Sequence, residues 1–185
     1  MQDTLKAMAR SNRSLVALTN QLLTLAQAEA ADYAQYAGVK VDLRAIATGT
    51  IEQLALLAQR RRVELAARLD APDAFVNGNE QLLAVLVFNL VDNAIRYSPE
   101  GGTVTVSLEA APEAVRLAVA DEGAGIAAGL REKVFEPFFR ASPLPGSGLG
   151  LAIVREIARA HRATLRLDDG PGGRGLLVTA AFPAG

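Results

Sequence analysis

The stretch NLVDNAIRYSP, residues Asn89–Pro99, decides how this chain folds and what it can bind. Asn89 and Asn93 are four residues apart, so a helix places both side chains on one face. A carboxamide offers an oxygen that suits a hard cation such as Mg²⁺ and an NH₂ group that suits phosphate oxygens. Two amides in an otherwise apolar run need several polar partners if they are buried. The stretch therefore predicts a helix that holds a metal ion and phosphates. The alternative is a core helix whose asparagines cap or bridge neighbouring elements.

Two further side chains lie on the same stripe of this helix. Arg96 is three residues beyond Asn93, where its fixed positive charge could meet phosphate. Tyr97 is four residues beyond Asn93 and could lay its ring against a purine. Asp92 has two interpretations, because it either belongs to the site or pairs with Arg96 at i,i+4 spacing.

The block DEGAGI, Asp121–Ile126, follows a predicted strand. A carboxylate at the position of Asp121 can accept a hydrogen bond from the amino group of adenine. Gly123 and Gly125 would let the backbone approach the base closely. A plain turn with a solvated Asp–Glu pair explains the same letters, so both interpretations stay open.

The block GSGLG, Gly146–Gly150, precedes an apolar helix. Glycine at a helix start costs about 1 kcal/mol of propensity, which indicates that a ligand requires it. Exposed N–H groups and the helix dipole suit a polyphosphate there. The spacing is not GxGxxG, and neither a P-loop nor the HRD and DFG sequences of eukaryotic protein kinases occur. The Pro- and Gly-rich segment 140–146 is predicted to be a lid, with Phe135, Phe138 and Phe139 as its hydrophobic anchor. The candidate binding residues are Asn89, Asn93, Arg96, Tyr97, Asp121, Gly123, Gly125, Ile126, Arg140, Gly146, Ser147, Gly148, Leu149 and Gly150, and the candidate metal ligands are Asn89 and Asn93.

The rest of the chain alternates between helical and strand-like patterns. Strands are predicted over residues 39–43, 63–69, 103–109, 114–120, 163–167 and 176–182. Helices are predicted to run to Leu57, from a cap at Asn77 or Asn79 to Tyr97, and over 130–136 and 149–160. Most strand connections are hairpins, so the fold class is α+β: a two-layer α/β sandwich with a mixed, mostly antiparallel sheet covered by three helices.

Residues 1–37 lack both proline and glycine and carry an apolar stripe close to a heptad seam. Its members are Leu5, Met8, Asn12, Leu15, Leu18, Leu22 and Leu25. A long helix buries such a stripe only against a partner helix. We therefore expect this helix either to pair with another chain or to pack on its own domain.

Composition excludes several classes of protein. The formal net charge of −1 gives no broad basic surface for nucleic acid. The absence of cysteine excludes disulfides and thiolate metal sites. No apolar run approaches the roughly 20 residues that span a bilayer, so this part of the chain is expected to be soluble. His161, the only histidine, is expected to be structural, near a helix C terminus where a positive charge is favourable.

On these motifs the chain resembles the C-terminal part of a bacterial two-component sensor histidine kinase of the GHKL superfamily. NLVDNAIRY resembles the N box, DEGAGI the first glycine box, VFEPFF the F box and GSGLGLAIV the second glycine box. The resemblance covers residues 10–185. It implies that residues 1–38 are the second helix of a dimerisation hairpin and that residues 39–185 are a catalytic domain with the Bergerat-type ATP-binding fold.

The resemblance also implies roles for individual residues. Asn89 would bind Mg²⁺, Asn93 metal or phosphate, Tyr97 adenine and Asp121 the adenine amino group. Gly146, Gly148 and Gly150 would frame the lid. Arg96 stands where the family usually has lysine, and DEGAGI replaces the commoner DNGPGI. The first hairpin helix, with its phosphoacceptor histidine, has no counterpart in this sequence.

The activity implied is transfer of the ATP γ-phosphoryl group to a histidine on a dimerisation helix, with ATP and Mg²⁺ as cofactors. This chain would bind ATP without phosphorylating itself. The implied partners are the hairpin with the acceptor histidine, a cognate response regulator and a second copy in a homodimer. Neither nucleic acid nor the membrane would contact this part, which would be the cytoplasmic domain of a parent in the bacterial inner membrane. The alternatives are a non-catalytic, ATP-responsive interaction module and a serine kinase acting on an anti-sigma partner.

Overall fold

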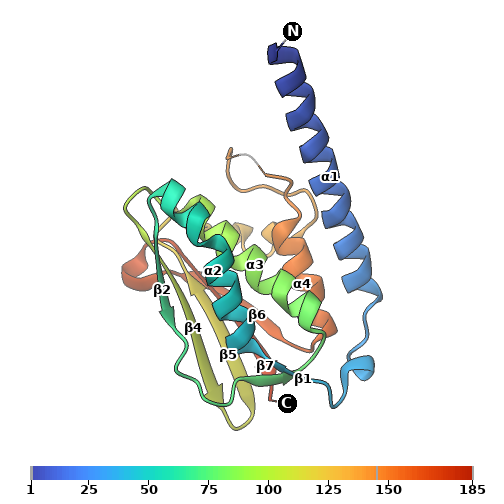
Figure 1. The fold of residues 1–185 in the computed structure, drawn as a ribbon. Coiled ribbons are helices and arrows are strands. Elements are labelled where there is room, and N and C mark those ends of the chain that lie inside the picture. The colour runs from blue at the N-terminus through green and yellow to red at the C-terminus, as the bar shows by residue number, and fades with distance from the viewer. Residues whose placement is uncertain (1, 145, 185) are drawn as a thin grey trace.

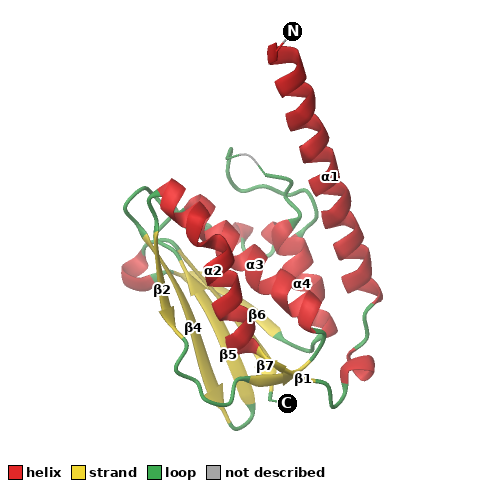
Figure 2. Cartoon of the chain, viewed as in Figure 1, coloured by secondary structure: helices red, strands yellow, loops and turns green. Residues whose placement is uncertain are grey.

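The computed structural model describes residues 2–144 and 146–184. Within them, a five-stranded sheet has the order β2-β4-β5-β7-β6, in which β2 and β4 are parallel and the other pairs antiparallel. Helices α2, α3 and α4 cover one face of the sheet (Figures 1 and 2). The predicted two-layer sandwich is therefore confirmed. The strands are β2 (Glu64–Arg68), β4 (Thr103–Ala111), β5 (Ala114–Ala120), β6 (Thr164–Asp169) and β7 (Leu176–Pro183), and the helices are α2 (Leu43–Arg61), α3 (Glu80–Tyr97) and α4 (Gly150–Ala160).

The central helix α3 forms where the pattern predicts it. Asn79 caps it, since its Oδ1 accepts a hydrogen bond from the Leu82 N–H at 3.1 Å. The helix ends at Tyr97, before Ser98 and Pro99. Its apolar stripe is buried against the sheet and its neighbouring helices. The buried members are Leu82, Leu83, Leu86, Val87, Leu90, Val91, Ala94 and Ile95.

The prediction of a short helix over Leu130–Glu136 is wrong. The segment instead forms two single 3₁₀ turns, Ala128–Leu130 and Lys133–Phe135. Pro137 forces Glu136 into an extended conformation, with ψ of 136°, so the second turn has no room to continue. The segment is held by tertiary contacts, because Val134 and Phe135 are buried in the core.

The strand β3 (Phe75–Asn77) was not predicted, and the predicted strand over residues 39–43 is shorter than expected. β1 (Lys40–Asp42) pairs with β3 in an antiparallel ribbon outside the main sheet. A strand of three residues is too short to show a period of two. Leu43 starts α2 instead of ending β1, because Asp42 caps that helix at the Arg44 and Ala45 N–H groups.

The N-terminal helix α1 (Gln2–Ala30) ends before the predicted residue 37, and a 3₁₀ turn, η1, follows at Tyr33–Tyr36. Leu25 and Ala28 are buried where its last turns contact α4, whereas the Leu15 side chain is 61% exposed. The stripe therefore packs partly on its own domain, and pairing of the remainder with another chain stays a prediction. The side chains of Leu5 and Met8 lie outside the described residues. None of the described helices is both long and apolar enough to cross a membrane.

His161 joins the start of α3 to the segment that follows α1. Its ring is 1% exposed and stacks on Tyr36, with ring centroids 5.1 Å apart. The Asn79 N–H donates to Nε2 at 3.0 Å, and Nδ1 lies 2.7 Å from the Ile157 carbonyl oxygen. We assign the neutral tautomer with its proton on Nδ1. Burial lowers the pKa of His161, although the bond to Ile157 raises it, so the positive charge expected at the helix end is disfavoured.

This environment predicts a pH-dependent stability. Below pH 6.5, the ordinary pKa of histidine, the unfolded chain takes up a proton that folded His161 does not. The free energy of unfolding should therefore fall by at most about 1.4 kcal/mol per pH unit until the lowered pKa is reached. Urea unfolding between about pH 7.5 and 5.5 measures this slope. His161→Phe keeps a ring on Tyr36 and should lose the histidine contribution to the slope. It should also cost about 1–3 kcal/mol for the unpaired Asn79 N–H. If the free energy of unfolding of His161→Phe depends on pH as steeply as that of the wild type, the neutral state assigned to folded His161 is contradicted.

Candidate functional site

The two carboxamides of α3 face the first residue of α4. A Cβ added to Gly150 would lie 3.1 Å from Asn89 Oδ1 and 3.4 Å from Asn93 Nδ2. Asn89 Nδ2 donates to the Val85 carbonyl at 2.8 Å, which orients the amide and leaves its oxygen toward Gly150. The fold therefore brings the asparagine pair and the second glycine block together, and a side chain at Gly150 would press on the Asn89 amide.

Of the two residues that follow on the same stripe, one is engaged elsewhere. Arg96 Nε donates to Asp92 Oδ2 at 2.6 Å, so the pairing interpretation of Asp92 is the one observed. The guanidinium is thereby held on its own helix. The Tyr97 side chain is exposed. Its carbonyl oxygen would be only 2.5 Å from a Cβ at Gly123, so the end of α3 touches the first glycine block.

Asp121 is a buried carboxylate at the end of β5. It is 7% exposed, and its Oδ1 accepts hydrogen bonds from the Gly123 N–H at 2.8 Å and the Leu176 N–H at 3.2 Å. Burial raises its pKa, against the lowering effect of these two bonds. The solvated Asp–Glu turn is therefore excluded for Asp121. Glu122 is exposed, and its carboxylate accepts a hydrogen bond from the Thr103 N–H at 2.9 Å.

A glycine in the β6–β7 connection supports this carboxylate. Gly175 has φ of +70°, and a Cβ there would lie 1.8 Å from the Asp121 carbonyl oxygen. No side chain fits at that approach. A cavity of about 390 Å³ opens between residues 123–127 and the connection. Neither an α3 residue nor Asp121 is among those that line it, so the cavity lies at the first glycine block and not at the carboxamides.

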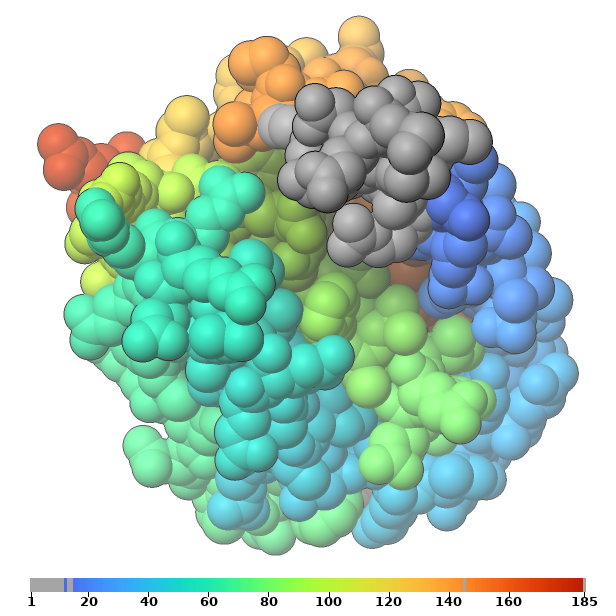
Figure 3. All heavy atoms as spheres, turned by 45° about the horizontal axis from the view of Figure 1, so that its top comes forward, coloured from blue at the N-terminus to red at the C-terminus, as the bar shows by residue number. Residues whose placement is uncertain are grey.

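The predicted lid starts from a strained turn. Phe138 has φ of +67°, and its N–H donates to the Gly148 carbonyl at 3.0 Å. Gly148 has φ of +74°, and a Cβ there would meet the Phe138 backbone at 2.7 Å. The phenylalanine anchor is only partly as predicted, because Phe135 is buried and Phe138 is exposed. In Figure 3 the orange segment that follows lies at the edge of the face formed by α2, α3 and α1.

Three other predicted residues make local contacts in the lid. Arg140 Nη2 donates to the Leu144 carbonyl, which closes its own loop. Ser147 Oγ accepts a hydrogen bond from the Leu149 N–H at 3.2 Å. The Leu149 side chain is fully buried and belongs to the core, so only its backbone is left for a ligand. Arg140 therefore has an observed structural partner and no observed contact with the carboxamides.

The structure adds two elements that the sequence prediction missed. Leu176, the first residue of β7, holds Asp121 through hydrogen bonds, and Gly175 meets it from the β6–β7 connection, which was predicted only as a hairpin loop. Its glycine-rich sequence, residues 170–175, was the available signal. Arg131 holds the other end of the first glycine block through the Ile126 carbonyl. A lone arginine in a turn carries no such signal.

Comparison with known proteins places this geometry in a family. Residues 78–185 match the family described as histidine kinase-, DNA gyrase B- and HSP90-like ATPase. The sensor-like histidine kinase SenX3 of Mycobacterium tuberculosis is 40% identical over 150 residues, which are 78% of this chain and 36% of SenX3. The chain thus spans about a third of the length of that relative.

Solved structures agree with the sequence comparison. The mycobacterial sensor histidine kinase MprB is 35% identical, with a TM-score of 0.69 over 78% of this chain and 95% of that chain. Full-length ShkA, solved with AMPPNP, is 25% identical, with a TM-score of 0.82 over 99% of this chain and 39% of that chain. The chain belongs to the histidine kinase-, DNA gyrase B- and HSP90-like ATPase family.

Proposed function

We propose that this chain binds ATP with Mg²⁺ and directs the γ-phosphoryl group to a histidine on a dimerisation helix, as the catalytic part of a sensor histidine kinase. The observation that carries the proposal is the approach of Asn89 and Asn93 to Gly150, at 3.1 Å and 3.4 Å from the Cβ that glycine lacks. Two amide side chains meet a glycine helix start there, and this combination of oxygen ligands and helix N–H groups suits a metal–triphosphate group. The relatives named as sensor histidine kinases support the choice of reaction.

The residues present fit Mg²⁺ through oxygen. The described residues include no cluster of three or more His, Cys, Asp or Glu side chains that could hold a metal. Mg²⁺ commonly takes few protein ligands and completes its octahedron with water and substrate phosphates. Asn89 and Asn93 would hold it, and when bound it would neutralise charge on the phosphates.

The remaining residues of the site would bind and orient the nucleotide. Asp121 keeps Oδ1 on two backbone N–H groups, which leaves Oδ2 to accept from the adenine amino group. The exposed Tyr97 ring would cover the base, and Gly146, Gly148 and Gly150 would let the lid backbone close over the phosphates. Gly123, Gly125 and Ile126 would form the wall beside Asp121. The site would thus act by positioning, as phosphoryl transfer requires.

His161 is not the phosphoryl acceptor. It is 1% exposed, and both of its ring nitrogens are engaged, with Asn79 and Ile157. It is the only histidine of this chain. The acceptor must therefore come from another segment or chain, and this chain alone should bind ATP without phosphorylating itself.

The exposed apolar side chains of α1 are the basis for the partners that we propose. Its exposed apolar side chains, Leu15, Val16, Leu22 and Leu23, are available for a helix of a second copy. We propose that residues 1–38 belong to a dimerisation hairpin, that residues 39–185 form the catalytic domain, and that a response regulator receives the phosphoryl group. The cytoplasmic face of the bacterial inner membrane is the proposed location of the parent protein.

Removing either carboxamide should weaken nucleotide binding. Asn93→Ala and Asn89→Ala each remove one ligand to the metal or phosphates, and a hydrogen bond to a charged group contributes about 1.5–3 kcal/mol. We expect Mg·ATP affinity to fall by about 10- to 100-fold in isothermal titration calorimetry. Asn20→Ala, on the outside of α1, is the matched control. Equal affinities in all four proteins would overturn the site assignment.

Asp121→Asn should separate recognition of the base from stability. Because burial raises the pKa of Asp121, its favourable contribution to stability exists below pH 3.8 and is lost as pH rises through the folded pKa. At neutral pH the neutral amide should therefore unfold at the same or a higher temperature, since its Oδ1 still accepts from Gly123 and Leu176. Its NH₂ would face the adenine amino group, and ATP affinity should fall at least about tenfold. A lower unfolding temperature with unchanged affinity would contradict both expectations.

Transfer itself is tested in trans. The wild-type chain is mixed with a dimerisation hairpin that carries the acceptor histidine and with ATP labelled at the γ-phosphate. We expect acid-labile phosphate on the hairpin and none on this chain. Acid-stable phosphate on an added anti-sigma protein would indicate a serine kinase. ATP binding without any transfer would favour the non-catalytic, ATP-responsive interaction module.

A further inference from the structure

The loop Asp121–Ile126 has few side chains with which to hold its shape. Three of its six residues are Gly123, Ala124 and Gly125. Its first end is fixed, because the Asp121 N–H donates to the Leu176 carbonyl at 2.9 Å and Asp121 Oδ1 accepts from the Leu176 N–H. Its other end, at Ile126, forms no strand pairing. A glycine-rich loop with one free end samples many conformations.

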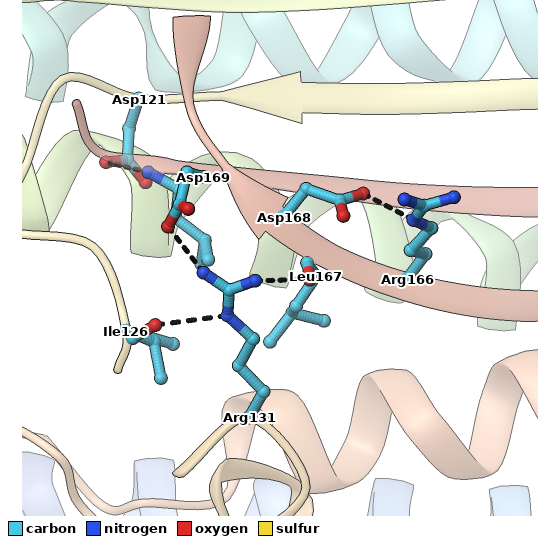
Figure 4. Close-up of polar contacts among 8 residues, drawn as sticks. Asp121, Ile126, Arg131, Arg166, Leu167, Asp168 and Asp169 are labelled. Atoms are coloured by element: carbon cyan, nitrogen blue, oxygen red, sulfur yellow. Dashed lines mark hydrogen bonds and ion pairs between the residues drawn. The ribbon is translucent and has the colours of Figure 1, made fainter. Parts of the chain in front are cut away.

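Arg131 supplies the second anchor (Figure 4). Its Nε donates to the Ile126 carbonyl at 3.1 Å, and Nη1 donates to the Leu167 carbonyl of β6 at 3.2 Å. Nη2 pairs with Asp169 Oδ1 at 2.5 Å. One guanidinium therefore ties the loop end to two residues near the end of β6. Among the described residues, the Ile126 carbonyl accepts no other hydrogen bond.

The arrangement of the three guanidinium nitrogens of Arg131, which form a planar fork of donors, matters more here than its positive charge. The Arg131 side chain is 22% exposed, whereas Asp169 is 71% exposed, so the ion pair is largely solvated and worth little. The hydrogen bonds to the Ile126 and Leu167 carbonyls are less exposed, and they leave the guanidinium on different sides (Figure 4). The three N–H donors of lysine share one nitrogen, so they cannot reach three acceptors that are spread around a planar guanidinium.

We infer that Arg131 is a positioning residue for the base of the nucleotide. It touches no ligand itself. By holding Ile126 against β6, while Leu176 holds Asp121, it fixes both ends of the loop whose residues 123–126 line the cavity of about 390 Å³. The inference rests on the proposed nucleotide site, and it concerns the base end of that site and not the phosphate end at Asn89 and Asn93.

The test compares Arg131→Ala with a control on β6, the strand that Arg131 contacts. Arg166 pairs with Asp168 at 2.7 Å, is exposed, and points away from the loop, so Arg166→Ala removes an arginine and an ion pair without touching Ile126 (Figure 4). Each protein is titrated with Mg·ATP and with Mg·tripolyphosphate. We expect Arg131→Ala to lose about tenfold in ATP affinity and less than about twofold in tripolyphosphate affinity, and Arg166→Ala to bind both ligands like the wild type.

Two milder variants identify the cause and remain informative if Arg131→Ala does not fold. Asp169→Asn removes only the solvated ion pair and should change ATP affinity less than about threefold. Arg131→Lys keeps the charge and loses the fork, so it should resemble Arg131→Ala. Full recovery of ATP affinity by lysine would overturn the inference, because the role would then be charge alone. Equal losses for ATP and tripolyphosphate would also overturn it, since the base would not be singled out.

Hydrogen exchange on the nucleotide-free chain separates this inference from the proposed function. We expect the amides of Gly123–Ile126 to exchange at least about tenfold faster in Arg131→Ala than in the wild type, with α3 unchanged. Unchanged loop exchange would overturn the anchoring role whatever the ligand. A wild-type chain that binds no ATP, but whose loop exchange depends on Arg131, would overturn the proposed function and with it the inference about the base, while leaving the anchor.

Discussion

The close approach of α3 to the start of α4 is the constraint on which the site depends. Gly150 leaves room for Asn89 Oδ1 and Asn93 Nδ2 because it has no side chain, and the Asn89 amide is oriented by Val85 on its own helix. The leucines and valines of α3 are buried in the core, so the two amides stand on a rigid helix and not on a loop. Polar groups positioned in this way lose little entropy when a ligand arrives. The glycine that weakens α4 thus lets two polar side chains lie between two packed helices.

The second half of the site depends on contacts between residues far apart in the chain. The Asp121 N–H donates one hydrogen bond to the Leu176 carbonyl, and the Asp121 carboxylate accepts two more, from the N–H groups of Gly123 and of Leu176, 55 residues later. Ile126 is held through Arg131 to Leu167 and Asp169 of the neighbouring strand. The β6–β7 hairpin therefore supports both ends of a glycine-rich loop that could not hold itself. A buried carboxylate costs stability at neutral pH, and this frame of hydrogen bonds limits that cost.

The parts of the fold that could be predicted are those with a strong local pattern. α3 has a cap, a long apolar stripe and a proline stop, and the β4–β5 hairpin alternates over enough residues to fix its faces. The short helix at residues 130–136 failed because Pro137 and the burial of Val134 and Phe135 outweigh local propensity. In the site, the asparagines could be predicted because amides are unusual in an apolar helix, and the glycines because they are unusual at a helix start. Arg131 gave no such signal, because its role comes from tertiary neighbours that a single sequence does not show, and the glycine-rich segment 170–175 gave a signal without showing that Gly175 meets Asp121.

The two carboxamides of the proposed phosphate site and the structural contacts of α3 lie at different points along the helix. The Asn79 N–H at its start donates to His161, which stacks on Tyr36 from the segment after α1. Tyr97 at its end touches Gly123 of the loop beside Asp121. An 18-residue helix is about 27 Å long, so the two ends share no side-chain contact. Since α1 packs on α4, which begins at Gly150, a movement of the N-terminal helix has two routes to the carboxamides: one through α4 and one through the contact of His161 with the start of α3. The same close packing that holds the carboxamides in place would carry such a movement to them.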